Sequence, residues 1–308
     1  MEKITILALH LGVGGVENSI ISLANMLCEK YNVEIISTYK LASEPAFKID
    51  DRVKVTYLLS EKLKPNRTEI NNAIKKCNIF KIAKEGIKAL KVLYNKKAKM
   101  INAIKSLDSN IVISTRIYHN KLLGKYGKDI KVKIAQEHNH HNNNKKYINQ
   151  VVNSLKNIDY LMPVSEELKN FYEDKLKGKK IKCIYIPHCV DVYPEITSTL
   201  KENNILSVGR LAKEKGYIDL IEVFKEFNKR MPNWNLNICG NGVEYENINK
   251  RIKELELEGK ANLLGFKNKD ELNEIFLNSS IYVMSSYTES FGLVLIDAES
   301  YRITTCSF

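Results

Sequence analysis

Residues 280–299 constrain the fold most, because three kinds of sequence pattern meet in this stretch. A short apolar run that ends at Met284 predicts a buried strand. A polar turn follows it, and from Phe291 onward the apolar residues recur at helical spacing. A strand, a loop and a helix in this order are typical of an open α/β sheet, in which ligands bind at the carboxyl ends of the strands.

Two carboxylates flank the start of this predicted helix. Glu289 precedes it and Asp297 lies inside it, so a rise of ~1.5 Å per residue separates them by roughly 8 to 10 Å. They are too far apart to share a proton, but they suit two hydroxyl groups of one long ligand. Gly292 lets a ligand approach the backbone, where the first amides of a helix attract anions. The alternative is an acidic first turn that only complements the helix dipole.

The string from Glu289 to Asp297 resembles the Glu-x7-Glu signature of retaining nucleotide-sugar glycosyltransferases of family 4, with Asp in the second position. The resemblance implies that Glu289 contacts the transferred sugar and that Asp297 holds the ribose hydroxyls of the donor. It also implies that the backbone amides of Phe291, Gly292 and Leu293 face the donor. Asp297 is one methylene shorter than the Glu of the family.

A second stretch carries positive charge in a similar setting. A strand pattern is followed by Gly209, Arg210 and then Lys215, all before a helical pattern. Two cations in one turn can converge on a diphosphate, although exposed Arg and Lys are common in turns. The string resembles the family's Gly-Arg-Leu-x-x-x-Lys-Gly motif, which implies that Arg210 and Lys215 hold the donor diphosphate. The resemblance also implies that the backbone at Gly265 and Phe266 meets the edge of the nucleobase.

The first predicted strand spans residues 4–9, and the turn after it is rich in glycine. It is not the dinucleotide-binding Gly-x-Gly-x-x-Gly, because Glu17 takes the place of the third glycine and would repel a pyrophosphate. Gly14, Gly15 and Glu17 resemble instead the Gly-Gly-x-Glu turn of the same family. This resemblance implies an acceptor-side loop that lines the cleft opposite the donor.

A histidine-rich loop follows the strand predicted at residues 132–135. Clustered histidines suggest a metal site, but consecutive histidines in an Asn-rich loop are more often exposed, and no partner spacing lies nearby. We therefore expect no metal. The segment Glu137-His138-Asn139 resembles the strand-end histidine of the family's N-terminal domain, which implies a catalytic position for His138 beside the transferred sugar. A loop histidine without a role is the alternative.

The length of 308 residues suits two domains. The six cysteines are scattered without a Cys-x-x-Cys pair, which favours reduced thiols over a zinc or disulfide scaffold. The first residues do not form a signal peptide, and no apolar run approaches ~18 residues. We therefore expect a cytoplasmic protein that does not span a membrane.

The formal net charge of +12 suits nucleic acid or an anionic membrane, and a compositional bias toward Lys is the plain alternative. No nucleic-acid-binding motif accompanies the charge, so we expect no nucleic acid. Residues 69–106 form a long basic amphipathic pattern with Ile87, Leu90 and Tyr94 on its apolar face. Such a face usually packs in the core below a solvated lysine face. The functional alternative is a peripheral contact with anionic lipid at the inner face of the cell membrane.

Two successive β/α halves with ligand turns at strand ends predict an α/β fold of two Rossmann-like domains facing a cleft, the GT-B architecture. We expect an N-terminal acceptor-side domain at residues 1–190, a linker at 191–203 and a nucleotide-sugar-binding domain at 204–308. Pro187 and His188 open a bend that resembles the end of the family's N-terminal domain. At residues 301–308 the chain departs from the family, whose members run on by a strand and a helix. We therefore expect a C-terminally truncated, incomplete second domain.

These features predict a retaining glycosyltransferase of hexosyltransferase type. It would move a sugar from a nucleoside diphosphate sugar, UDP-sugar first among them, to a glycan or lipid-linked acceptor in cell-surface polysaccharide synthesis. It needs no metal or other cofactor, because Arg210 and Lys215 neutralise the departing diphosphate. Two alternatives stay open: a nucleotide-sugar epimerase on the same fold, and an inactive truncated copy that binds nucleotide.

Overall fold

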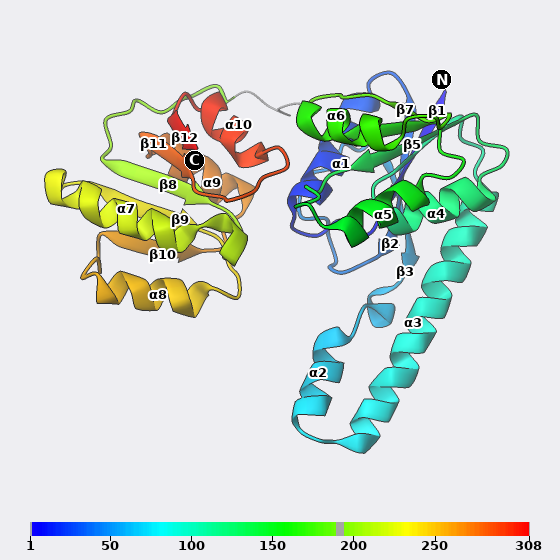
Figure 1. Cartoon of the computed structure of the whole chain (residues 1–308), viewed down its shortest axis with the longest axis horizontal. Helices are drawn as coiled ribbons and strands as arrows, with labels where there is room; N and C mark the ends of the chain where they lie inside the picture. Colours follow the sequence, from blue (N-terminus) through cyan, green and yellow to red (C-terminus); the bar gives the residue numbers. More distant parts are fainter. Residues whose placement is uncertain (1, 189–193, 308) are drawn as a thin grey trace. The chain divides into compact units, whose positions relative to one another are not determined.

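The computed structural model of the chain describes residues 2–188 and 194–307. The chain divides into two compact units, Met1–Cys189 and Val190–Phe308. Each unit is built around one parallel β-sheet flanked by helices (Figure 1). The expected α/β class with two Rossmann-like units is confirmed. The described part of the expected 191–203 linker begins at residue 194, and the rest lies outside the described residues.

The described part of the first unit holds a seven-stranded sheet in the order β3-β2-β1-β4-β5-β6-β7, in which every neighbouring pair is parallel. Its strands are β1 (Lys3–Ala8), β2 (Asn32–Tyr39), β3 (Lys54–Leu59), β4 (Ile111–Ser114), β5 (Val132–Glu137), β6 (Tyr160–Pro163) and β7 (Lys182–Cys183). Its α-helices are α1 (Gly15–Leu27), α2 (Arg67–Lys75), α3 (Ile79–Lys105), α4 (Ile117–Tyr126), α5 (Lys145–Ser154) and α6 (Glu166–Lys175).

The core of the first unit forms where α1 covers the central strands. Ile20, Ile21 and Ala24 recur at helical spacing and are buried against Ile6 of β1 and Ile35 of β2. The central strands are almost continuously buried, as expected for a parallel sheet covered on both faces. The packing fixes β1 and its following loop at the centre of the sheet.

The edge strand β7 is only two residues long and pairs with β6. The single helical stretch expected at residues 69–106 is divided into α2 and α3. The chain turns at Cys77, whose φ of 48° is left-handed, and the Asn78 side chain caps α3 by accepting a hydrogen bond from the backbone amide of Lys81. The two helices form a hairpin that projects from the body of the first unit (Figure 1).

The apolar face expected to pack in the core does not do so. Ile87, Leu90 and Tyr94 of α3 are exposed, whereas Val92 and Met100 are buried. The side of α3 that faces the first unit is therefore a different one from the side that the apolar periodicity indicated.

The second unit holds a five-stranded parallel sheet in the order β10-β9-β8-β11-β12. Its strands are β8 (Asn204–Val208), β9 (Asn235–Cys239), β10 (Ala261–Gly265), β11 (Ile281–Met284) and β12 (Thr304–Ser307). Its α-helices are α7 (Tyr217–Arg230), α8 (Tyr245–Glu254), α9 (Lys269–Leu277) and α10 (Leu293–Ser300). The segment at residues 301–308, expected to precede a missing strand, supplies the edge strand β12 instead.

Both faces of the second sheet are covered by helices. Ile205 of β8 packs in a cluster with Phe224 of α7 and Ile252 of α8. The next residue, Leu206, packs in a second cluster with Phe276 of α9 and Ala298 of α10. Consecutive strand residues point to opposite faces, so the two clusters lie on opposite sides of the sheet. The helix that follows β8 therefore covers one face and the helix that follows β11 covers the other.

Candidate functional site

The strand order of the second unit fixes where a ligand can bind. β8 is the first strand of its sheet, β9 lies on one side of it and β11 on the other. Their connections leave on opposite faces, which makes the carboxyl edge between β8 and β11 the topological switch point, where ligands bind in open α/β sheets. The predicted donor-binding residues come from these loops and from the loop after β10.

The loop after β8 carries both predicted cations. Arg210 is exposed and pairs with Glu214 (Nη2 to Oε1, 2.6 Å), and Lys215 ends a 3₁₀ turn before α7. Gly216 follows with a φ of +64°, and a Cβ placed there would lie 2.0 Å from the carbonyl oxygen of Ser285. A residue with a side chain does not fit between these two loops. The glycine thus brings the loop after β11 into contact with Lys215.

Several hydrogen bonds join the same two loops. The Ser285 hydroxyl donates to the carbonyl oxygen of Lys215 (2.8 Å), and the backbone amide of Tyr287 donates to that of Glu214 (3.0 Å). The Tyr287 hydroxyl donates to Asp219 of α7 (2.8 Å). Ser285 is buried, so its hydrogen bond is protected from water. The two loops therefore form one connected surface.

The two predicted donor ligands Lys215 and Glu289 meet on this surface. Lys215 Nζ lies 2.5 Å from Glu289 Oε2, and the two side chains are 23% and 29% exposed. The ammonium and the carboxylate neutralise each other, and a diphosphate that binds Lys215 would compete with this carboxylate. The structure brings Lys215 and Glu289 together, whereas the more exposed Arg210 pairs with Glu214 in the same loop.

Glu289 and Asp297, the two carboxylates that were predicted to contact the donor, both affect the pKa of one buried phenol. Burial raises the pKa of Tyr282 in β11, and the nearby charges of Tyr217, Glu289 and Asp297 add to that shift. Glu289 and Asp297 therefore lie within electrostatic range of the same hydroxyl group. Asp297 is half-buried inside α10.

α10 begins at Leu293, directly after Gly292, where the sequence predicted that a ligand could approach the backbone. Gly292 has a φ of +80°, which favours glycine, and the N-cap provides no side-chain hydrogen bond. Phe291 and Leu293 are half-buried on either side of it. The amide end of α10 is thus placed beside Glu289, whose Cγ lies 3.6 Å from the Cβ position of Gly292.

The remaining strand-end loops are held to the loop after β8. A Cβ at Gly240 would lie 1.9 Å from the carbonyl oxygen of Gly209, and the amide of Gly240 donates to the carbonyl oxygen of Gly265 (2.8 Å). Gly265 has a φ of +70°, and Phe266 after it is half exposed. These contacts place the predicted nucleobase-edge residues at the same edge as the cations.

The first unit has a comparable edge where the loops after β1 and β4 diverge. Glu17 of α1 is 3% exposed, and its Oε1 lies 2.7 Å from Arg116 Nη2 and 3.6 Å from His10 Nε2. A Cβ at Gly14 would lie 2.2 Å from Glu17 Oε2, so Gly14 makes room for this carboxylate, and Gly15 is the first residue of α1. Glu17 therefore lies inside an ion pair beside the glycine turn.

His138 lies at the end of β5 and is almost completely buried. Its Nε2 lies 3.3 Å from Gln136 Oε1, and its ring stacks on His188 with centroids 5.8 Å apart. Burial, assisted by the neighbouring His188 and Arg116, lowers the pKa of His138 to about 3. The imidazole is therefore neutral near pH 7. Ser19 of α1 contacts His188 (Oγ to Nδ1, 2.9 Å), which connects this pair to the edge that carries Glu17.

The sequence assigned no role to three residues at this edge of the first unit, His10, Arg116 and His188. His10 and Arg116 follow β1 and β4, and the rule that ligands bind where strand order reverses could have indicated both. His188 was placed only in the bend that resembles the end of the family's N-terminal domain, and no local pattern predicts its stacking on His138.

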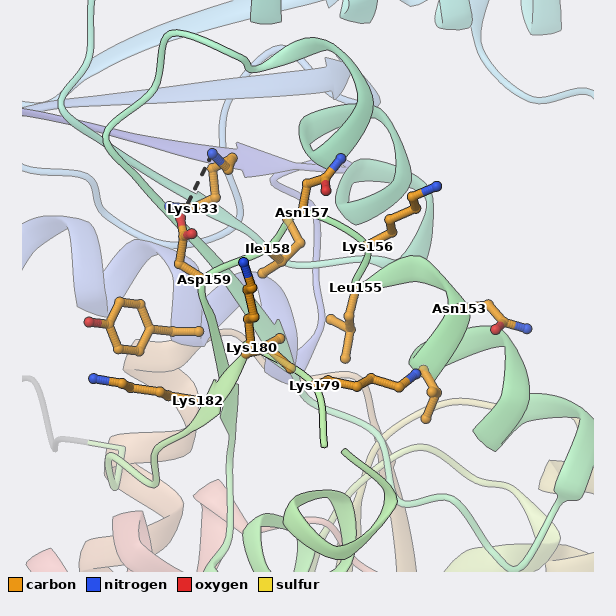
Figure 2. A pocket seen from close by; sticks show the side chains of 13 residues that line it. Lys133, Asn153, Leu155, Lys156, Asn157, Ile158, Asp159, Lys179, Lys180 and Lys182 are labelled. Atoms are coloured by element: carbon orange, nitrogen blue, oxygen red, sulfur yellow. Dashed lines mark hydrogen bonds and ion pairs between the residues drawn. The ribbon is translucent and has the colours of Figure 1, made fainter. Parts of the chain in front are cut away.

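A lysine-lined groove lies at the opposite edge of the first sheet, where β5, β6 and β7 begin (Figure 2). Its volume is about 750 Å³, and its lysines are Lys133, Lys156, Lys179, Lys180 and Lys182. The one carboxylate in its lining, Asp159, accepts a hydrogen bond from the amide of Lys133 (2.8 Å). This groove contains none of the predicted site residues.

Known glycosyltransferases resemble this chain in sequence. The family model described as Glycosyl transferases group 1 matches residues 194–305. An uncharacterized glycosyltransferase of Haemophilus influenzae is 26% identical over 312 residues, which cover 100% of this chain and 81% of that protein. In Campylobacter jejuni, the GalNAc-alpha-(1->4)-GalNAc-alpha-(1->3)-diNAcBac-PP-undecaprenol alpha-1,4-N-acetyl-D-galactosaminyltransferase is 24% identical over 315 residues, covering 100% of this chain and 79% of that protein.

The fold was compared with solved structures. The pneumococcal O-GlcNAc transferase GtfA, solved in complex with UDP and GlcNAc, matches with a TM-score of 0.76 at 14% identity, covering 100% of this chain and 84% of that one. This likeness makes the fold GT-B. The family match lies in the second unit, and together with the fold it supports the expected enzyme class, a glycosyltransferase. The expected enzyme class is confirmed, and the full coverage of this chain by its relatives gives no support to the expected truncation.

Proposed function

We propose that the protein is a retaining glycosyltransferase that transfers a sugar from a UDP-sugar to a glycan or lipid-linked acceptor in cell-surface polysaccharide synthesis. The single observation that carries the proposal is the junction of the loops after β8 and β11. There Lys215 and Glu289 lie 2.5 Å apart beside the amide end of α10. A cation, a carboxylate and helix amides at one strand edge suit a ligand with a charged middle and a hydroxyl-bearing end.

The chemical demand is to stabilise the charge that develops when the bond between the anomeric carbon and the diphosphate oxygen breaks. Arg210 and Lys215 supply two positive charges for the departing diphosphate, and the amides at Phe291, Gly292 and Leu293 add hydrogen-bond donors. Preorganised charge of this kind commonly contributes the largest part of catalysis. When the diphosphate takes Lys215, Glu289 is released to orient the hydroxyl groups of the sugar.

The rest of the donor would contact the same edge. Asp297 would hold the ribose hydroxyls, and the backbone at Gly265 and Phe266 would meet the nucleobase edge. In the first unit, Gly14, Gly15 and Glu17 would form the acceptor-side loop. His138 would act on the transferred sugar as a neutral hydrogen-bonding group, because its lowered pKa removes the charged form near pH 7.

The relatives support the substrate classes. The pneumococcal GtfA structure contains UDP and GlcNAc, and the name of the Campylobacter enzyme includes a PP-undecaprenol-linked substrate. We carry both classes over as proposals, a UDP-sugar donor and a lipid-linked or free glycan acceptor. A lipid-linked acceptor also favours a place at the inner face of the cell membrane.

The first experiment is a thermal-shift panel across nucleoside diphosphates and their sugars. Ligand binding raises apparent stability by mass action, so UDP and one UDP-sugar are expected to raise the midpoint at 100 times their Kd by several degrees. A separate assay measures sugar transfer from a radiolabelled donor. Turnover of donor without any acceptor would favour an epimerase, and UDP binding without turnover would favour an inactive nucleotide-binding copy.

The second experiment tests the two cations. Arg210→Ala and Lys215→Ala are each expected to lower donor affinity or kcat/KM by about 10- to 100-fold, because a hydrogen bond to a charged group contributes roughly 1.5–3 kcal/mol. Matched controls are Arg230→Ala and Lys229→Ala at the far end of α7. Unchanged transfer by both loop variants would refute the assigned roles.

A further inference from the structure

α2 and α3 form the hairpin of residues 67–105, which we call the α2–α3 arm. An exposed apolar surface lies on the side of α3 that faces solvent. Phe80, Ile87, Leu90 and Tyr94 are 91%, 69%, 68% and 75% exposed. Their spacings of seven, three and four residues place them on one face of the helix. Val92, which packs against the first unit, lies on another face. The exposed stripe therefore adds nothing to the core.

Lysines border this stripe. At 100° per residue, Lys84 and Lys91 follow one edge of it and Lys97 follows the other. The only acidic residue of α3 is Glu85, which is nearly buried and accepts a hydrogen bond from Asn66 (Nδ2 to Oε2, 2.7 Å). The solvent face of α3 therefore presents positive charge without a carboxylate.

Positive charge is densest in this arm. Residues 67–105 contain eleven Lys and Arg and two Glu, a net charge of +9, whereas the rest of the first unit carries +7 and residues 190–308 carry −4. A general compositional bias toward lysine would spread the excess over the chain. The concentration in one hairpin points to a local function.

The arm is firmly attached to the first unit. Met100 and Ile104 at the base of α3 are buried, and Lys96 Nζ lies 4.0 Å from the centroid of the Tyr118 ring. Asn66, at the start of α2, is buried in its hydrogen bond to α3. Among the described residues no helix has the length and apolarity needed to cross a bilayer. The geometry suits a helix that lies along a surface.

We propose that the outer face of α3 docks on a bilayer that contains anionic phospholipid. The apolar stripe would enter the boundary between headgroups and acyl chains, and the flanking lysines would reach the headgroup phosphates. A second copy of the chain is a poor occupant, because it would bring nine positive charges against nine. Nucleic acid would leave the apolar stripe unused. The inference deepens the proposed function by naming the surface that would meet a lipid-linked acceptor, but lipid binding needs no donor or acceptor.

The test is co-sedimentation of the full chain with vesicles of phosphatidylcholine, with or without 30 mol% phosphatidylglycerol. Wild type is expected to bind the anionic vesicles at least tenfold more tightly than the neutral ones, and added salt should weaken this binding. Phe80→Ser combined with Leu90→Ser removes two of the four apolar side chains of the stripe, and Lys84→Glu combined with Lys88→Glu and Lys91→Glu lowers the net charge of the arm from +9 to +3. Each set is expected to reduce binding to anionic vesicles at least tenfold.

The matched control carries Lys229→Glu, Lys250→Glu and Lys253→Glu, an equal charge change on the second unit. Circular dichroism and the UDP thermal shift establish that each variant is folded, and a variant that binds UDP but not vesicles separates this inference from the proposed function. Equal loss in the control and arm variants, or binding that ignores lipid charge, would overturn the proposal. So would a dimer in sedimentation velocity without lipid that the Phe80 and Leu90 changes abolish.

Discussion

In the proposed function, the ion pair of Lys215 and Glu289 would affect both donor binding and catalysis. In the structure the carboxylate occupies the ammonium that a donor diphosphate would need. Binding of a diphosphate therefore includes the free energy of separating this pair. The pair lies less than one-third exposed, so solvent weakens the attraction only partly.

This competition separates two effects of one substitution. Glu289→Gln is expected to lower the Kd for UDP about two- to fivefold, because Lys215 loses its anionic partner, and to lower kcat at least 100-fold, because the sugar loses the negatively charged carboxylate that would orient its hydroxyl groups. Isothermal titration with UDP and a transfer assay measure the two quantities. Weaker UDP binding by this variant would contradict the competition.

Gly216 provides a stability test at one position. Gly216→Ala is expected to destabilise the second unit by about 2–4 kcal/mol, because the residue has a φ of +64° and its Cβ would lie 2.0 Å from a carbonyl oxygen. Gly259→Ala is the control, since its φ is +75° but no atom lies within 4 Å of its Cβ position. We expect about 1 kcal/mol there. Equal losses of unfolding free energy in urea titrations would show that backbone strain alone matters.

At the scale of elements, the site depends on how the loops after β8 and β11 are joined. Ser285→Ala removes a buried hydrogen bond to the Lys215 carbonyl, and Tyr287→Phe removes the bond to Asp219. The double variant keeps every charge of the site, yet it is expected to weaken UDP binding about three- to tenfold because Lys215 is held less firmly. Isothermal titration gives the affinity.

The control for these loops is Ser279→Ala at the amino end of β11. Ser279 is also buried, and its hydroxyl donates to a backbone carbonyl, that of Ile275, at 2.7 Å. It should cost similar stability and leave UDP affinity unchanged. A similar loss of affinity in the control would assign the effect to stability rather than to the loops.

Sequence patterns predicted the elements near the site better than those far from it. The strands predicted at residues 4–9 and 132–135, and the one predicted to end at Met284, lie within two residues of β1, β5 and β11, because short β-branched or apolar runs between turn residues leave little choice. The 69–106 stretch was predicted as one helix because the left-handed turn at Cys77 has no glycine or proline to signal it. Its apolar face was misassigned because periodicity identifies a stripe and cannot tell which partner covers it.

The residues of the candidate site also divide into those that local motifs predicted and those whose contacts depend on the tertiary fold. Arg210, Lys215 and Glu289 were predicted from local motifs, and the structure places them on two adjoining loops. The pairing of Glu17 with Arg116 joins residues 99 positions apart, and no local pattern contains that information. Tertiary contacts of this kind depend on strand order, which has to be known first.

At the scale of the whole molecule, all six histidines lie in the first unit. Burial lowers the pKa of His119 and of His138 from 6.5 to about 3. Between these values the unfolded chain binds protons that the folded unit does not, so stability is full above pH ~6.5 and falls as the pH falls. Each histidine is expected to cost about 2 kcal/mol at pH 5. The raised pKa of buried Glu137 opposes this trend.

The measurement is hydrogen exchange at pH 7.5 and at pH 5, corrected for intrinsic exchange rates. Peptides from β1 and α1 are expected to lose protection at the lower pH, whereas peptides from β8 and α7 serve as the control, because the second unit contains no histidine. His119→Asn should flatten the pH dependence of the first unit. Identical pH dependence in the two units would contradict the assignment to histidine.

The concentration of positive charge on the α2–α3 arm would also orient the first unit as it approaches a negatively charged surface, before contact. Nine positive charges on one protruding hairpin give this unit a strong electric dipole along the arm. A negatively charged surface therefore exerts a torque on it from about a Debye length away, roughly 8 Å in physiological salt. The unit would turn during its approach and arrive with the α2–α3 arm facing the surface, so that encounter and orientation become one diffusional event.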